Sequence, residues 1–159
     1  MKKSDNKVVN LFEESNKGIQ KTVITETMKM KRGGSLSNPV LAYETWGKLS
    51  KSKDNVVVIL TGLSASSHVA SSNSDSNPGW WEGIVGPDKA IDTNKFYIIC
   101  VNSLGSCFGS TGPASINQIT GEPFRLTFPE LTIDDMATAT KFLLDKLGIK
   151  QINTLVGPS

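Results

Sequence analysis

Two short apolar runs constrain the fold of this chain more than any other feature of its sequence. Val56–Leu60 holds three valines, an isoleucine and a leucine, and Phe96–Val101 is apolar throughout as well. Because β-branched residues favour strands and neither run alternates with polar residues, both predict strands that are buried on two faces. Parallel strands need long crossover connections, and a long segment separates these two runs. The sequence therefore predicts an α/β fold with a mostly parallel sheet.

A hairpin is predicted ahead of the first buried strand. Met28–Lys31 alternates apolar and polar residues, Gly33 and Gly34 favour a turn, and Val40–Trp46 returns as a second strand. Residues 1–25 are polar and charged with only a weak apolar pattern. We therefore expect a polar N-terminal extension over residues 1–25, followed by a single core domain over residues 26–159.

A helix and a last strand are predicted near the end of the chain. Thr132 can cap the helix, Asp134 and Asp135 suit its first turn, and Gly148 is a natural stop. Six residues fall on one helical face: Ile133, Met136, Thr140, Leu143, Leu144 and Leu147. The last strand is expected around residues 152–156.

Composition narrows the class of protein. Of the 159 residues, 38% are hydrophobic and 20% are charged, which is typical of a globular domain. A net charge of +2 favours neither nucleic acid nor a membrane surface as partner, and no apolar run approaches the length of a membrane span. Met1–Lys3 is followed by polar residues rather than by the apolar stretch of a secretory signal. Cys100 and Cys107 form no disulfide framework, so we expect a reduced, cytoplasmic protein.

A serine-rich segment separates the two buried strands. Seven of the fourteen residues from Ser64 to Asn77 are serine. Such a segment is either a flexible surface loop or a functional one, because long loops are uncommon in compact domains. Pro78–Trp81 follows with large apolar side chains, which we expect to pack against the rest of the chain.

Few residues are available for metal binding or acid–base chemistry. His68 is the only histidine, and together with two isolated cysteines it does not make a metal site. We expect His68 to pack in its loop or to line a substrate site rather than to act as a general base. Cys107 has no base near it in the sequence other than His68, so a packing role is favoured. The glycines Gly105, Gly109 and Gly112 match neither a dinucleotide-binding motif nor a P-loop.

Two turns at the ends of predicted strands could carry chemistry. Gly157-Pro158-Ser159 follows the last strand, and some enzymes present a nucleophilic serine in a Gly-x-Ser-x-Gly turn between a strand and a helix. On the tripeptide alone, an ordinary turn is the better interpretation. Thr61–Leu63 follows the first buried strand, where such enzymes place a backbone N–H of their oxyanion hole. A plain strand-end turn fits these residues equally well.

Five longer strings resemble homoserine O-acetyltransferases, in order and with the spacing of that family, over roughly residues 38–159. The strings are Leu41–Gly47, Pro78–Pro87, Ala90–Thr93, Gly109–Asn117 and Phe128–Met136. The resemblance implies the N-terminal part of an α/β-hydrolase fold. It implies an incomplete core domain over residues 26–159, with the helical lid and the C-terminal half absent from this chain.

The resemblance also implies an activity: transfer of an acyl group from acyl-coenzyme A to the side-chain hydroxyl of an amino acid. Carried over by motif, Ser159 would be the nucleophile, and Leu63 would supply an oxyanion-hole N–H from its backbone. The mechanism would be ping-pong through an acylated serine. Succinyl- or acetyl-coenzyme A would be a co-substrate, no cofactor or metal would be bound, and the intact enzyme is expected to be a homodimer.

Two departures from the homoserine pattern resemble the serine O-succinyltransferase branch. Thr61–Ala65 stands where homoserine enzymes usually have His-Ala-Leu-Thr-Gly, and Gly157–Ser159 replaces Gly-Gly-Ser; Asn102–Gly109 agrees with this branch. The residues expected to set the length of the acceptor are Gly62, Leu63, Ser64 and Ala65. We expect L-serine as the acceptor, in cysteine biosynthesis, with L-homoserine and methionine biosynthesis as the alternative.

Two other functions stay open. One is an esterase or thioesterase of the same fold, in which water takes the place of the amino acid. The other is an inactive, truncated remnant, because the catalytic acid, the histidine and the helix that follow Ser159 in the family are outside this chain. We therefore expect the 159-residue chain by itself to show no serine acylation.

Overall fold

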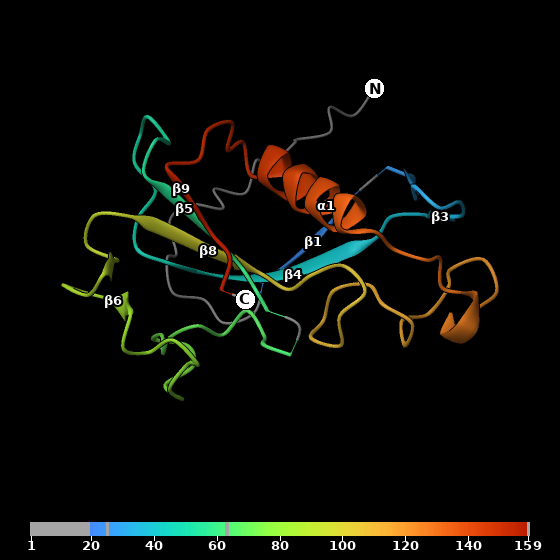
Figure 1. Ribbon diagram of the computed structural model, residues 1–159, viewed down its shortest axis with the longest axis horizontal. Helices are drawn as coiled ribbons and strands as arrows, with labels where there is room; N and C mark the ends of the chain where they lie inside the picture. The colour runs from blue at the N-terminus through green and yellow to red at the C-terminus, as the bar shows by residue number, and fades with distance from the viewer. Residues whose placement is uncertain (1–19, 25, 63, 159) are drawn as a thin grey trace, which may run out of the picture.

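A five-stranded sheet forms the centre of the computed structural model, which describes residues 20–24, 26–62 and 64–158 (Figure 1). The strand order is β1-β4-β8-β5-β9. The bounds are β1 (Gln20–Val23), β4 (Val40–Trp46), β5 (Val56–Leu60), β8 (Tyr97–Val101) and β9 (Thr154–Val156). β5 pairs in parallel with β8 and β9, whereas β4 is antiparallel to both β1 and β8. Every strand except β4 therefore runs in one direction, which confirms the predicted α/β fold with a mostly parallel sheet.

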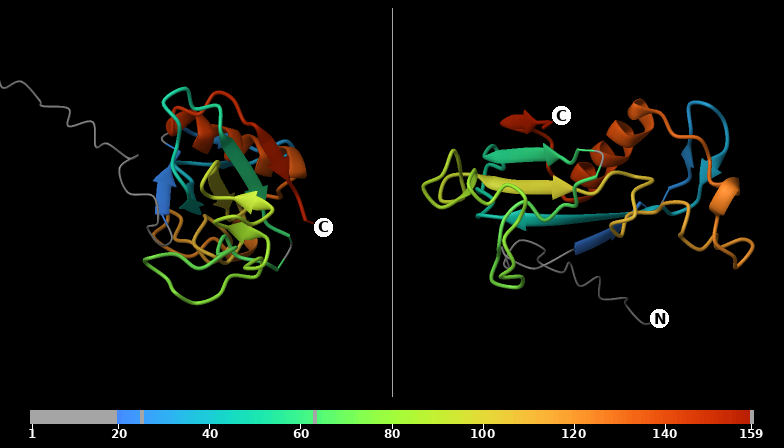
Figure 2. Two further views of the ribbon diagram at one scale, coloured as in Figure 1. Left: turned by 90° about the vertical axis from the view of Figure 1, so that its left-hand side faces the viewer. Right: turned by 60° about the horizontal axis from the view of Figure 1, so that its bottom comes forward.

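The two apolar runs are the strands β5 and β8, as predicted, and alternate side chains of both strands fill two separate cores. Val58 and Ile99 belong to the core on the side of α1 (Ile133–Lys146), whereas Ile59 and Cys100 belong to the core on the opposite face. The left-hand view in Figure 2 shows α1 on one side of the strands and the segment with β6 (Val85–Gly86) and β7 (Ile91–Asp92) on the other. Both faces are covered, so continuous apolar runs are favoured over alternation.

The predicted hairpin is only partly correct. β2 (Met28–Lys29) does turn back after Gly33, but its partner is β3 (Ser35–Leu36) in a separate two-stranded sheet. β4 belongs instead to the main sheet, where its hydrogen-bonding edges are taken by β1 and β8. Six of the seven residues of β4 are buried between its two partner strands, so tertiary packing overrides the local hairpin pattern.

β1 also changes the expected domain boundary. Its residues, 20–23, pair antiparallel with Val40–Tyr43, so the sheet begins inside the stretch expected to be a polar extension over residues 1–25. Residues 1–19 of that stretch lie outside the described residues.

Helix α1 has the expected ends. The Thr132 hydroxyl accepts a hydrogen bond from the Asp135 N–H, and the Asp135 carboxylate accepts one from the Thr132 N–H, which completes a capping box. At the other end Gly148 has a left-handed φ of 67°, and the N–H of Ile149 donates to the Leu144 carbonyl at 2.9 Å. One residue of the predicted apolar face is placed wrongly: Ile133 is 79% exposed, because it is the first residue of the helix and lies beyond the edge of the core.

A single turn of 3-10 helix, η1 (Arg125–Thr127), precedes α1 in the long connection from β8. Among the residues that the structure describes, no helix has both the length and the apolar character needed to cross a membrane.

Candidate functional site

The candidate site lies where three neighbouring strands end. β8, β5 and β9 run in the same direction, and Ile59 of β5 is opposite Val156 of β9, so the carboxyl ends of the strands meet at one edge of the sheet. Thr61–Gly62 follows β5, and Gly157–Pro158 follows β9. Open α/β sheets bind their ligands at this edge. The fold therefore brings together the two turns that the sequence singled out.

Two of the predicted site residues, Leu63 and Ser159, lie outside the described residues. Their roles as oxyanion-hole donor and nucleophile stay predictions. The neighbouring residues are described: Gly62 and Ala65 are partly buried, and Ser64 is exposed. The Ala65 N–H donates to the Gly62 carbonyl at 3.4 Å, so a tight turn does follow β5, as predicted. The part that this turn would play in the choice of acceptor is untested.

Asn102, the first residue after β8, anchors the serine-rich loop (Ser64–Asn77) to the sheet. Its side chain is fully buried. Its Oδ1 accepts a hydrogen bond from the Ser67 N–H at 2.6 Å, and its Nδ2 donates to the Ser67 hydroxyl at 3.0 Å and to the Phe108 carbonyl at 2.9 Å. One amide thus satisfies buried polar groups of two loops, those that follow β5 and β8.

Glu44 of β4 is a buried carboxylate, 2% exposed, beneath the same loop. Its Oε1 accepts a hydrogen bond from the Ser67 hydroxyl at 3.2 Å, and its Oε2 lies 2.9 Å from Nδ1 of His68. Nε2 of His68 lies 2.9 Å from the Asn77 carbonyl oxygen. Burial opposes the charged form of His68, but the hydrogen bonds to Glu44 and Asn77 and the nearby negative charge outweigh burial and raise the pKa of His68. Of the two roles expected for His68, its contacts correspond to packing within the loop.

No pattern in the sequence indicated this network, because its members come from three distant segments. One signal was present, however. Glu44 is the one charged residue of Val40–Trp46, at a position that alternation places on the same face as Ala42 and Trp46. A charged residue at such a position is almost never fully buried unless it is paired.

Glu82 holds the later part of the segment after β5. Its Oε2 accepts hydrogen bonds from the N–H groups of Gly79, at 3.0 Å, and Ser71, at 2.6 Å, and its Oε1 accepts one from the Ser71 hydroxyl at 2.9 Å. The hydrogen bond from Gly79 makes the largest contribution to the pKa of Glu82. Together with the hydrogen bonds from Ser71 and the charge of Lys89, it lowers this pKa to about 2. A Cβ atom on Gly79 would collide with the backbone of Val69, so these two stretches of chain pass too closely for any larger residue. The loop is therefore held by specific contacts along its length.

We expect acid to weaken this part of the fold through Glu82. Because the folded-state pKa of Glu82 is about 2 and its ordinary value is 4.5, its contribution to stability is present above pH 4.5 and is lost as the pH falls toward 2. Glu82→Gln should lower the melting temperature at pH 7, since it removes the negative charge that strengthens these hydrogen bonds and faces Lys89, and should flatten the decline in acid. Thermal unfolding followed by circular dichroism from pH 7 to pH 3 measures both effects. An identical acid slope in the variant and the parent would contradict the assignment.

The two cysteines are free and lie in different surroundings. Cys100 is fully buried in β8 opposite Glu44, and burial, with the added charge of Glu44, raises the pKa of its thiol. It is therefore an unreactive core residue. Cys107 is exposed, so the packing role expected for it is wrong: the loop after β8 is held by Asn102 and leaves this side chain in solvent.

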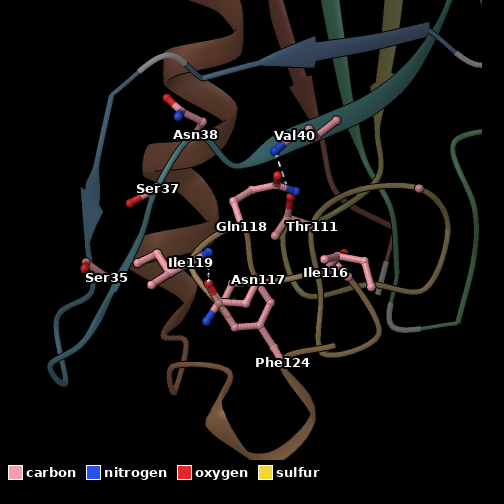
Figure 3. Close-up of a pocket in the computed structure, with 12 residues that line it drawn as sticks. Ser35, Ser37, Asn38, Val40, Thr111, Ile116, Asn117, Gln118, Ile119 and Phe124 are labelled. Carbon is pink, nitrogen blue, oxygen red and sulfur yellow. Dashed lines mark hydrogen bonds between the residues drawn. The ribbon is translucent and has the colours of Figure 1, made fainter. Parts of the chain in front are cut away.

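Two cavities lie elsewhere than at the turns after β5 and β9. One, of about 300 Å³, lies between Ser35–Val40 and the loop Gly109–Phe124. Figure 3 shows its side chains, with the hydrogen bond from the Val40 N–H to the Thr111 hydroxyl at one end. The other, of about 480 Å³, lies beside Trp46, Glu82 and Lys89. Neither includes a residue of the turns after β5 and β9. Within residues 20–24, 26–62 and 64–158, no three His, Cys, Asp or Glu side chains are grouped to hold a metal ion.

The chain is an α/β protein whose candidate site lies at the carboxyl ends of parallel strands. Two strand-end turns meet there at one edge of the sheet. The family model described as the alpha/beta hydrolase fold matches residues 55–159. The chain therefore belongs to the α/β-hydrolase fold family.

The relatives found by sequence bear out the resemblance to acyltransferases of this fold. A protein named serine O-succinyltransferase from Frateuria aurantia is 59% identical over 131 residues, which are 82% of this chain and 36% of that protein. One of the same name from Litchfieldella anticariensis is 52% identical over 132 residues, 83% of this chain and 36% of that protein. The chain thus spans little more than a third of the length of these curated relatives.

Solved structures with the same fold include both an acyltransferase and an esterase. Homoserine O-acetyltransferase from Bacillus anthracis superposes with a TM-score of 0.80 at 33% identity, covering 89% of this chain and 40% of that one. Esterase E22 superposes with a TM-score of 0.76 at 38% identity, covering 89% of this chain and 41% of that one.

Proposed function

We propose that the protein carrying this chain transfers an acyl group from acyl-coenzyme A to the side-chain hydroxyl of L-serine. The observation that carries the proposal is the meeting of the turns after β5 and β9 at one sheet edge, in a chain that is 59% identical to a protein named serine O-succinyltransferase. Succinyl-coenzyme A is the proposed donor, with acetyl-coenzyme A as the alternative.

In the proposed mechanism, the Ser159 hydroxyl attacks the thioester carbonyl. The oxyanion that forms accepts a hydrogen bond from the Leu63 N–H, and the carbon–sulfur bond breaks as coenzyme A leaves with a proton. The acceptor hydroxyl then attacks the acylated serine, which forms the new ester and restores Ser159. His68 is already bonded on both ring nitrogens, so the base in this mechanism is a residue outside these 159.

Acceptor choice is assigned to Gly62, Leu63, Ser64 and Ala65, since this turn adjoins the proposed oxyanion hole. L-serine and L-homoserine differ by one methylene, for which a pocket discriminates by only about 1–3 kcal/mol. We expect discrimination of this size rather than absolute selectivity, in a cytoplasmic homodimer serving cysteine biosynthesis.

A hydrolase is the second candidate, and one observation favours it: esterase E22 is 38% identical in structural superposition, against 33% for the homoserine O-acetyltransferase. The two functions share the acyl-serine step and differ in what attacks it. Water would replace the amino acid, and no amino acid would be needed for turnover.

The test is release of coenzyme A from succinyl- and acetyl-coenzyme A, measured with L-serine, with L-homoserine and with no acceptor. We expect release to require the amino acid and to match the O-succinylserine formed, as quantified by mass spectrometry. Equal release without an acceptor would instead establish a thioesterase. Cleavage of a simple ester without any use of coenzyme A would establish an esterase.

A further inference from the structure

The ring of His68 is set between two hydrogen-bond acceptors. Nδ1 lies 2.9 Å from a carboxylate oxygen of Glu44, and Nε2 lies 2.9 Å from the carbonyl oxygen of Asn77. An ionised carboxylate and a carbonyl can only accept, so both ring nitrogens must carry hydrogen to satisfy both contacts. Only the protonated imidazolium does so, because the neutral ring carries a single N–H.

One of these hydrogen bonds joins the serine-rich loop to the sheet, and the other joins the early part of the loop to its last residue. His68 lies near the start of the loop, Asn77 is its last residue, and Glu44 belongs to β4. Removal of one proton would turn a ring lone pair toward either the buried carboxylate of Glu44 or the carbonyl of the exposed residue Asn77, and that acceptor would lose its donor. The ring thus connects three segments only in its charged form.

We propose that the protonated imidazolium of His68 is a positioning group for the turn after β5, which it holds by clamping the serine-rich loop to Glu44. Ser67, the neighbour of His68, donates from its hydroxyl to the other oxygen of the same carboxylate. Ala65, the last residue of the turn, stands two residues before Ser67. That the turn serves catalysis rests on the proposed function; the clamp itself does not.

Two carboxylates face the ring. Glu44 contacts Nδ1 from the sheet, and Oδ2 of Asp75 lies 3.9 Å from Nε2 within the loop. Both favour the charged ring, and the pKa of His68 is raised above its ordinary value of 6.5. A raised pKa means that the clamp contributes fully to stability below pH 6.5 and is lost as the pH rises through the folded-state pKa.

Because His68 is the only histidine among these 159 residues, its ring signals in an NMR titration of this chain need no assignment. The loop has reporters of its own: the indole N–H of Trp46 donates to the Ser71 carbonyl at 3.2 Å, and that of Trp80 donates to the Ser66 carbonyl at 2.8 Å. We expect the ring to titrate above 6.5, and both indole signals to shift with the same midpoint. A ring midpoint at or below 6.5, or indole signals that do not follow the ring, would overturn the clamp.

A matched pair of variants separates the clamp from general electrostatics. Glu44→Gln keeps the shape of the side chain but removes the charge bonded to Nδ1, and should lower the His68 midpoint relative to that of the unaltered chain. Asp75→Asn removes the more distant charge and leaves both acceptors of the ring in place, so it should lower the His68 midpoint less than Glu44→Gln does. Equal midpoints in the two variants would count against the clamp. If Glu44→Gln does not fold, the shared midpoint of the His68 ring and the two indole signals in the unaltered chain still tests the clamp. The titration contains no acyl donor, so a negative result would not contradict the proposed acyl transfer. Likewise, a negative result in the coenzyme A assay would not contradict the clamp.

Discussion

Replacement of Ser159 by alanine is expected to reduce acyl transfer from succinyl-coenzyme A by a factor of about 10⁴ to 10⁶, the range found when a nucleophilic serine is removed from enzymes that work through an acyl-serine. The reason is chemical: without the hydroxyl there is no atom to carry the acyl group between donor and acceptor. The measurement is steady-state release of coenzyme A by the protein, with the turnover of the parent as reference.

The control for this variant is Ser76→Ala, which makes the same chemical change at an exposed serine of the serine-rich loop. We expect its turnover to stay within a factor of about two of the parent, since exposed surface substitutions rarely change stability by more than about 0.5 kcal/mol. Mass spectrometry of the protein mixed with donor alone adds a direct observation: an acyl group on the peptide that contains Ser159. Retention of more than a tenth of the activity by Ser159→Ala would mean that the nucleophile lies elsewhere.

Asn102→Ala is expected to lower the free energy of unfolding by about 2–5 kcal/mol. The substitution removes three hydrogen bonds made by one fully buried amide, to the Ser67 N–H, the Ser67 hydroxyl and the Phe108 carbonyl. Each buried group left without a partner costs about 1–3 kcal/mol. The groups concerned belong to the loops after β5 and β8, so both loops should loosen together. Urea unfolding followed by tryptophan fluorescence measures the change.

Asn73→Ala is the matched control, because it truncates an exposed asparagine in the same serine-rich loop. Its expected change is within about 0.5 kcal/mol. Asn102→Asp preserves the volume of the side chain and the acceptor toward the Ser67 N–H, but it loses the donor toward the Phe108 carbonyl. We therefore expect this variant to lose a substantial part of the free energy of unfolding as well. A loss below about 1 kcal/mol for Asn102→Ala would show that the two loops are held mainly by other contacts.

The parts of the fold predicted correctly from the sequence are those whose signal is local. β5 and β8 follow from uninterrupted β-branched runs, and the ends of α1 follow from Thr132 and Gly148. β4 was assigned to the wrong partner, because pairing is decided by distant strands and not by the pattern of the strand itself. β1 was missed for the same reason: its partner Val40–Tyr43 lies beyond an intervening two-stranded sheet.

The same distinction between local signals and distant contacts applies to the candidate site. The two strand-end turns could be found because each follows a recognisable strand. The contacts that hold the first of them could not, since Glu44 lies 24 residues from His68, and Asn102 lies 35 residues from Ser67. Only the folded sheet makes them neighbours.

The strand order also has a consequence for how the chain folds as it is synthesised. β5 takes β8 on one edge and β9 on the other, so Val57 pairs both with Ile98 and with Thr154. One edge of β5 can therefore pair only after β9 has been synthesised, many residues later. Contacts between segments so far apart in the sequence require the closure of a long loop, which slows folding. Until Thr154–Val156 leaves the ribosome, the apolar strand β5 has an unpaired edge, which is the kind of surface that aggregates or recruits chaperones. We expect a nascent chain halted before β9 to depend on chaperones for solubility, whereas one that includes β9 should depend on them less.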